Sequence, residues 1–122
     1  MLLEFNDDRP IFVQIAEGVE DAILSGAFPE ESQIPSITEF SVSYKINPAT
    51  ALKGINILVD NNIVYKKRGL GMFVMEGAVE KLREKRRQEF YNNYICSLVA
   101  EAKRLQLTKE DINIMIERGF EK

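Results

Sequence analysis

The chain has 122 residues, of which 45% are hydrophobic and 29% are charged, and its formal net charge is −3. This length accommodates one full domain with a small appendage, and no apolar run approaches the roughly 18 residues that a membrane span requires. Histidine is absent and Cys96 is the single cysteine, which excludes internal disulfides, histidine general bases and His-ligated metals.

Residues 10–25 predict an amphipathic helix. Proline at position 10 suits a first helical turn, because its missing N–H group would have no partner there. Apolar residues recur at helical spacing behind it and form one stripe. This stripe consists of Ile11 or Phe12, Ile15, Val19, Ala22 and Ile23.

Two short helices are expected next, and each has a clear start signal. Ser36 and Glu39 form a capping-box pattern, which predicts a helix from there to about Tyr44. Asn47 is a good N-cap and Pro48 a good first helical residue, so a second helix is predicted from Asn47 to about residue 61. Its predicted core face consists of Ala51, Leu52, Ile55, Leu58 and Val59, and Gly54 is interpreted as a point of close packing.

A β-hairpin is predicted over residues 63–75, because two runs of β-forming residues flank the glycine-containing segment 67–71. Helical periodicity returns from about residue 78 and predicts one long helix to about residue 106. Thr108 and Asp111 predict a second capping box before a last helix. The domain boundary is expected near residues 76–77.

Helix, turn, helix and basic hairpin in this order predict a winged helix-turn-helix. Residues 45–75 carry five basic residues against one acidic residue, although the whole chain is acidic. Phosphate binding depends on such a local field rather than on the total charge. We expect the start of the 47–61 helix to enter the major groove and the hairpin tip to approach phosphates or the minor groove. The residues expected at these positions are Asn47, Ala49, Thr50 and Lys53 on the helix, and Lys66, Lys67, Arg68, Gly69 and Gly71 on the hairpin.

Residues 9–75 resemble the N-terminal winged-helix domain of GntR-type bacterial transcription regulators. The matching segments are 10–16 (PIFVQIA), 23–26 (ILSG), 34–36 (IPS), 46–50 (INPAT) and 68–74 (RGLGMFV). The resemblance implies a dimer that binds operator DNA, usually as a repressor. Thr38 stands where that family usually has an arginine, so a bidentate donor is missing there. With Lys45 from the basic segment, the predicted DNA-binding set is Ser36, Thr38, Lys45, Asn47, Ala49, Thr50, Lys53, Lys66, Lys67, Arg68, Gly69 and Gly71.

The C-terminal part is similar to the short two-helix element of the YtrA-type subgroup, where it serves dimerisation. Two helices alone cannot bury so much apolar surface, and exposed patches beyond a few hundred Å² usually mean a partner. We expect that partner to be a second copy of the chain, and we expect Cys96 near this face to be a buried structural thiol. The predicted dimerisation residues are Phe90, Tyr91, Tyr94, Ile95, Leu98, Val99, Ala102, Leu105, Ile112, Met115, Ile116 and Phe120.

The predicted fold is α+β, mostly α, with a winged helix-turn-helix domain over 1–76 and a two-helix dimerisation domain over 77–122. The predicted function is a cytoplasmic, homodimeric DNA-binding repressor without a cofactor or metal. The sequence offers no catalytic constellation, so an enzyme is not expected. About 45 residues in two helices can hardly enclose a sizeable pocket within one subunit, so the site of any small-molecule effector would have to lie between subunits or between domains, and the effector is unknown. The alternative is a winged-helix protein-interaction module, which would show an apolar patch where a DNA-binding protein gathers its cations.

Overall fold

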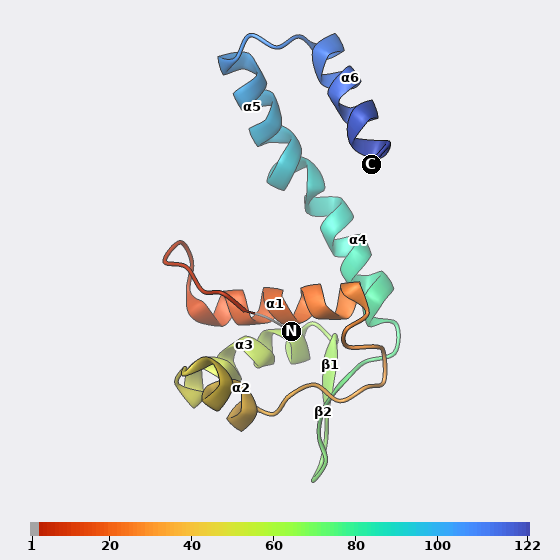
Figure 1. Cartoon of the computed structure of the whole chain (residues 1–122). Helices are drawn as coiled ribbons and strands as arrows, with labels where there is room; N and C mark the ends of the chain where they lie inside the picture. The colour runs from red at the N-terminus through yellow and green to blue at the C-terminus, as the bar shows by residue number, and fades with distance from the viewer. Residues whose placement is uncertain (1–2) are drawn as a thin grey trace. The chain divides into compact units, whose positions relative to one another are not determined.

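The structure, a computed structural model, describes residues 3–122 and divides them into two compact units between residues 84 and 85. In this part of the chain no helix is both long enough and apolar enough to cross a bilayer. The first unit is a mostly helical winged helix-turn-helix, as predicted (Figure 1). Its elements are α1 (Ile11–Ser25), α2 (Ile37–Tyr44), α3 (Pro48–Asp60), β1 (Val64–Lys67), β2 (Gly71–Val74) and the start of α4 (Ala78–Phe90).

Side-chain caps define the starts of α2 and α3, as the sequence predicts. The Glu39 N–H donates to Ser36 Oγ and the Ser36 N–H donates to Glu39 Oε1, each over 3.1 Å. The Asn47 side chain caps α3 by accepting a hydrogen bond of 2.8 Å from the N–H of Ala49. These bonds satisfy donors that a helix start would otherwise leave free.

The core of the first unit is the contact between α1 and α3. Ile15, Val19, Ile55 and Leu58 are fully buried there. Gly54 is buried as well, and a Cβ at this position would lie 2.7 Å from the backbone oxygen of Phe12, so the predicted close packing is confirmed. The interhelical approach at this point therefore depends on the absence of a side chain.

The prediction of a core position is wrong for one residue of α3. Leu52 is 47% exposed, whereas Ala51, Ile55 and Leu58 are buried. Gly54 occupies the position on the buried face of α3 that was predicted for Leu52. Because glycine carries no hydrophobic signal, the apolar pattern alone placed the buried face too far toward Leu52.

The hairpin is antiparallel, and its register pairs Val64 with Val74 and Lys67 with Gly71. Segment 31–34 extends this sheet on the free edge of β2. The N–H of Ile34 donates to the Met72 carbonyl over 3.0 Å, and the Val74 N–H donates to the Ser32 carbonyl over 2.9 Å. The wing is thus anchored at its base on both sides of β2.

The first unit continues past residue 76, where the sequence placed the domain boundary. Ala78 and Leu82 of α4 are buried in its core. The Glu30 carboxylate accepts hydrogen bonds from the N–H groups of Gly77 and Val79, at 2.9 and 3.0 Å. These bonds lower the pKa of Glu30, the one from Gly77 most, and tie the start of α4 to the turn after α1.

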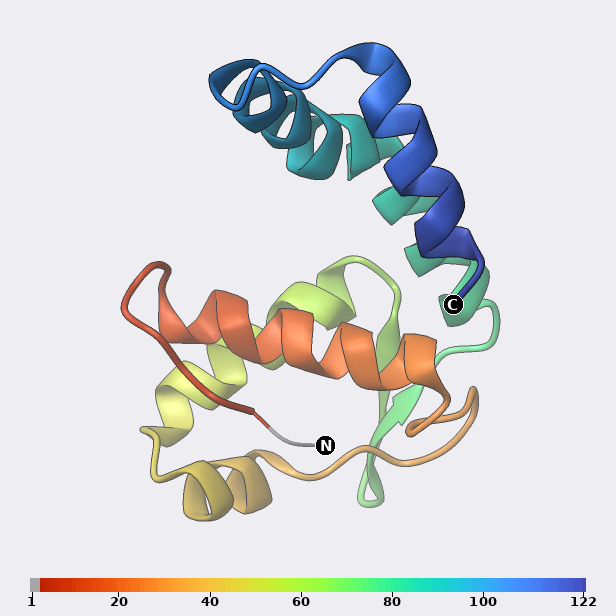
Figure 2. The same ribbon diagram turned by 45° about the horizontal axis from the view of Figure 1, so that its top comes forward.

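The second unit contains the end of α4, a π-helical turn η1 (Tyr91–Ile95), α5 (Cys96–Arg104) and α6 (Lys109–Phe120). The predicted helix over 78–106 is therefore interrupted by a π turn. Figure 2 shows α6 following α5 after a short loop. The predicted capping box is present, and the Thr108 N–H donates to Asp111, which lowers the pKa of that carboxyl. Cys96 is exposed in the single chain, so its burial stays a prediction that depends on the proposed dimer.

Candidate nucleic-acid interface

The exposed side of α3 is a ridge of four residues at helical spacing. Ala49, Leu52, Lys53 and Asn56 are all exposed, and they lie opposite the buried residues of the same helix. The spacing of three and four residues places them one above the other along one face. We call these four residues the α3 ridge. It combines a cation, an amide and two aliphatic side chains.

The position of the Lys53 ammonium is defined by an aromatic ring. Its Nζ lies 4.1 Å from the ring centroid of Phe12 on α1. The face of an aromatic ring attracts a cation, and this attraction restrains a long side chain that would otherwise sample many rotamers. The charge is therefore held on the α1 side of the α3 ridge.

The first N–H groups of α3 are already hydrogen-bonded within the chain. Pro48 has no N–H group, the N–H of Ala49 binds the Asn47 side chain, and that of Thr50 donates to the Asn47 carbonyl over 3.0 Å. Free amide groups were one reason for expecting a phosphate at this point. Because these amides already have partners, side chains and the helix dipole remain as the means of contact.

The turn between α2 and α3 contains a left-handed residue and is bridged by a side-chain hydrogen bond. Lys45 ends α2 with φ of 54°, in the left-handed region, and its side chain is exposed. Ser41 Oγ donates a hydrogen bond of 2.7 Å to the Ile46 carbonyl across the turn. Among the predicted residues of α2, Thr38 is exposed, whereas the Ser36 hydroxyl is used in the capping box.

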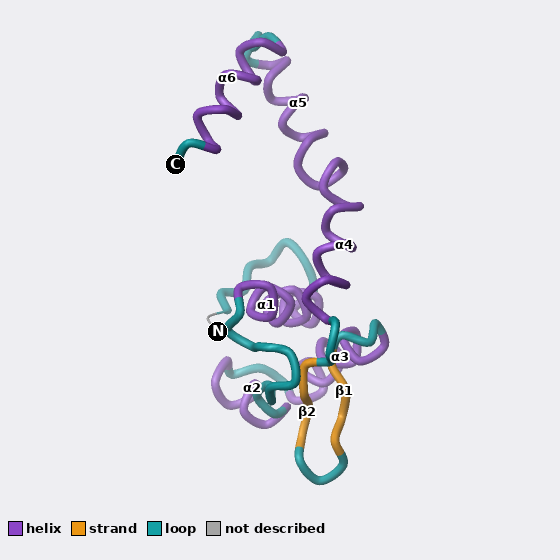
Figure 3. Tube along the Cα trace, turned by 90° about the vertical axis from the view of Figure 1, so that its right-hand side faces the viewer, coloured by secondary structure: helices purple, strands orange, loops and turns teal. Residues whose placement is uncertain are grey.

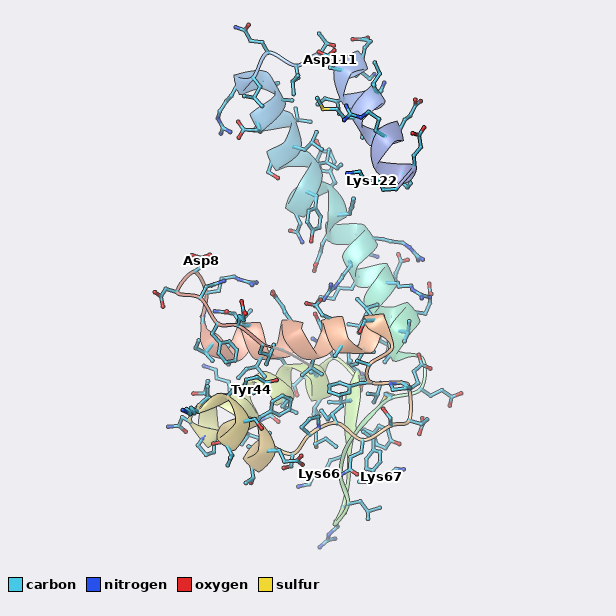
Figure 4. The ribbon with its side chains drawn as sticks, in the orientation of Figure 1. Asp8, Tyr44, Lys66, Lys67, Asp111 and Lys122 are labelled. Carbon is cyan, nitrogen blue, oxygen red and sulfur yellow. The ribbon has the colours of Figure 1, made fainter. Side chains whose placement is uncertain are left out.

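The wing separates two of its predicted cations. Lys66 and Lys67 are neighbours in β1, so their side chains leave opposite faces of the hairpin; Figure 4 shows them on its two sides. The Lys67 ammonium lies 4.3 Å from the ring centroid of Phe73 and 5.7 Å from that of Tyr65. Lys66 shares its face with Met72, which packs against the core. The two lysines therefore cannot meet one flat surface together.

The tip of the wing is shaped by two glycines and a distant glutamine. Gly69 and Gly71 have φ of 79° and 130°, which favour glycine. A Cβ on Gly71 would lie 2.5 Å from Nε2 of Gln33, and that nitrogen donates to the Leu70 carbonyl over 2.8 Å. Arg68 and Leu70 are exposed at the tip, which Figure 3 shows beyond the helices of the first unit. Gly71 is thus favoured by its backbone conformation, and a Cβ there would also displace the Gln33 amide from the Leu70 carbonyl.

The structure brings together part of the predicted DNA-binding set and adds two residues to the same surface. Ala49 and Lys53 lie on one ridge, whereas Asn47 and Ser36 serve as caps. The ridge also exposes Leu52 and Asn56, which are not in the predicted DNA-binding set. The spacing 49, 52, 53, 56 would have revealed them if Gly54 had been placed in the core.

The second unit exposes a long apolar face. Nine of the twelve predicted dimerisation residues are exposed in the single chain, while Ala102 is buried and Ile95 and Ile112 are half-buried. A groove between α5 and α6 is lined almost entirely by apolar groups, among them Leu98, Leu105 and Met115. Ile114 is 58% exposed and was missing from the predicted set.

No family model matches the chain. The chain is 29% identical over 111 residues to the HTH-type transcriptional regulator YhcF of Bacillus subtilis, covering 89% of this chain and 88% of YhcF. It is 30% identical to a transcriptional regulator from Bacteroides thetaiotaomicron assigned to the GntR family, with a TM-score of 0.72, covering 91% of this chain and 96% of that one. It is 26% identical to BusR of S. agalactiae, solved in complex with its busAB promoter DNA, with a TM-score of 0.58 over 89% of this chain and 51% of BusR.

Proposed function

The chain belongs to the GntR family of transcriptional regulators, and we propose that it binds a palindromic DNA operator as a homodimer and represses transcription. The relatives are regulators and not enzymes. The observation that carries the proposal is the α3 ridge, which is an exposed helix face with a restrained cation beside a protruding wing. A helix of this kind fits the major groove of B-DNA.

The local charge supports DNA as the partner. Segment 45–75 holds five basic residues and one acidic residue within a chain of net charge −3. Lys53 and Arg68 carry this charge on α3 and on the wing tip, and both side chains are exposed. BusR, a similar structure, was solved in complex with promoter DNA, and this supports DNA binding by the present chain.

The apolar face of the second unit supports the homodimer. Large side chains such as Tyr94, Leu105 and Phe120 are 65%, 62% and 88% exposed in the single chain. An identical copy offers the same face, and two-fold pairing would present two α3 ridges to two half-sites about one helical turn apart. A bacterial cytoplasm, where such DNA is accessible, is the proposed location.

Selection from a pool of random DNA duplexes tests the proposal without knowledge of the operator. Immobilised chain is expected to enrich an inverted repeat with half-sites spaced by about 10 base pairs. Placing that repeat over a promoter is expected to reduce transcription by purified polymerase, and an increase would indicate an activator. A selection that enriches no sequence would favour the protein-interaction module instead.

Replacing Lys53 tests whether the α3 ridge makes the contact. Lys53→Ala is expected to weaken binding to the selected operator by about 1–3 kcal/mol if a base contact is lost. Lys109→Ala removes an exposed lysine from α6 and serves as the matched control, with affinity unchanged. If Lys53→Ala and Lys109→Ala bind the operator with equal affinity, the α3 ridge does not contact the DNA through Lys53.

A further inference from the structure

One aliphatic side chain on the α3 ridge lies outside the hydrophobic core formed by the described residues of the first unit. Leu52 is 47% exposed and does not belong to the core cluster, whereas Ile55 and Leu58 of the same helix are 1% and 0% exposed. Burying an aliphatic side chain is favourable, and leaving a leucine in water forgoes that gain. Leu52 would therefore gain free energy by contact with a partner on the α3 ridge.

The neighbours of Leu52 define the chemistry of its partner. Ala49 lies three positions before it on the same ridge, and the polar residues Lys53 and Asn56 lie beside it. The apolar part is therefore narrow and is bordered by a cation and an amide. A protein partner would be expected to meet a broader contiguous apolar patch.

The major groove of DNA supplies a partner of this shape. Each thymine presents its 5-methyl group at the groove floor, and no other base carries an apolar group there. An asparagine amide can pair with the N6 and N7 groups of adenine, which is the partner of thymine. An aliphatic residue beside an asparagine is thus a combination suited to A·T base pairs.

We propose that Leu52 is a specificity-determining residue that reads thymine in the operator through its 5-methyl group. This rests on the proposed function, because it requires the α3 ridge to lie in the major groove. Ala49 provides room for the methyl group, and Asn56 reads the adenine edge of the same or the adjacent base pair. Lys53 supplies the charge that holds the ridge against the DNA.

Deoxyuridine tests the proposal, because it differs from thymidine only by the missing methyl group. The selected operator is synthesised with each thymine replaced singly by deoxyuridine, and each duplex is titrated with the intact chain. At one or more positions we expect affinity to fall about threefold to fivefold for each methyl removed. Leu52→Ala is expected to bind the thymidine and deoxyuridine duplexes equally.

Leu70→Ala is the matched control. Leu70 is 66% exposed at the wing tip and is not part of the α3 ridge. This variant is expected to retain the full difference between thymidine and deoxyuridine. Equal thermal midpoints of the two variants and the parent chain would show that neither substitution disturbs folding.

Two different results would overturn the proposal, and they separate its failure from that of the function. If the parent chain binds the operator but no deoxyuridine lowers its affinity, or if Leu52→Ala shows the same losses, Leu52 does not read thymine. If selection enriches no sequence, the proposed function itself fails and the inference fails with it.

Discussion

The tip of the wing depends on one side-chain amide supplied from outside the hairpin. Gln33 Nε2 donates to the Leu70 carbonyl over 2.8 Å, and the two residues are 37 positions apart in the chain. Gly71 leaves room for the Gln33 amide, because a Cβ there would lie 2.5 Å from Nε2. The glycines of such a tip are readily interpreted as allowing DNA to approach, but the φ of 130° at Gly71 already favours glycine there.

Removing the amide should loosen the tip alone. In Gln33→Ala the Leu70 carbonyl loses its donor, so NMR order parameters of residues 69–71 are expected to fall below about 0.6. The amide groups of α1 and α3 should keep the values of the parent chain. Unchanged order at the tip would show that the turn is held by its backbone alone.

At the scale of elements, the contact between α1 and α3 sets the position of the α3 ridge. Gly54 allows this contact, because a Cβ there would meet the Phe12 backbone oxygen at 2.7 Å and Ile15 side-chain atoms at 3.0 Å. A backbone atom cannot move aside as the end of a flexible side chain can. The distance between the two helices is therefore sensitive to a single methyl group.

Gly54→Ala has two opposing effects on the free energy of unfolding. Alanine favours the helix by about 1 kcal/mol, while overpacking costs about 1–3 kcal/mol, so we expect a net loss of stability in urea unfolding. Gly119→Ala is the matched control in α6, where a Cβ would meet nothing within 4 Å. It should be neutral or slightly stabilising. A gain of stability in Gly54→Ala would contradict the close contact.

The start of α4 should respond to acid through Glu30. The N–H groups of Gly77 and Val79 lower the pKa of this carboxyl in the folded chain. The unfolded chain therefore binds the proton more readily, and the stabilisation is complete above the ordinary carboxyl pKa of about 4.3. It is lost as the pH falls through the lowered pKa of the folded chain.

Glu30→Gln is therefore expected to lower the thermal midpoint at pH 7 and to lose this difference toward pH 3. Glu76→Gln changes an exposed carboxylate beside the same helix start and serves as the control. Parallel pH curves for the parent chain and Glu30→Gln would show that the two hydrogen bonds do not contribute to stability.

Local signals explain how much of this fold the sequence could predict. The capping residues at Ser36 and Asn47 placed the helix starts, because each start depends on contacts within four residues. Leu52 was misplaced because burial depends on a partner helix, and the small residue that allows its approach has no hydrophobic signal. The opposite faces of Lys66 and Lys67 follow from the strand period, but the bond from Gln33 joins distant segments and leaves no local pattern.

At the scale of the whole molecule, the proposed homodimer assigns different tasks to the two units. The first unit carries the α3 ridge and the wing, and the second unit carries the apolar face. Operator affinity then depends on pairing, because two linked ridges bind with a high effective concentration. Substitutions in the second unit should accordingly weaken DNA binding without any contact to DNA.

Leu98→Glu tests this coupling. A glutamate buried without a partner should raise the dimer dissociation constant by about two orders of magnitude or more, as measured by light scattering during size-exclusion chromatography. Val42→Glu introduces the same charge at a position of α2 that is 73% exposed and should leave the mass unchanged. If Leu98→Glu has the mass of the parent chain, the dimer uses another surface.

The salt dependence of operator binding tests the central claim most directly, because an acidic chain can bind DNA only through a locally basic surface. The selected operator is titrated with the parent chain at several salt concentrations. With roughly six phosphate contacts per dimer, the logarithm of the affinity should fall against the logarithm of the salt concentration with a slope near −5. An affinity that does not change with salt would contradict the account.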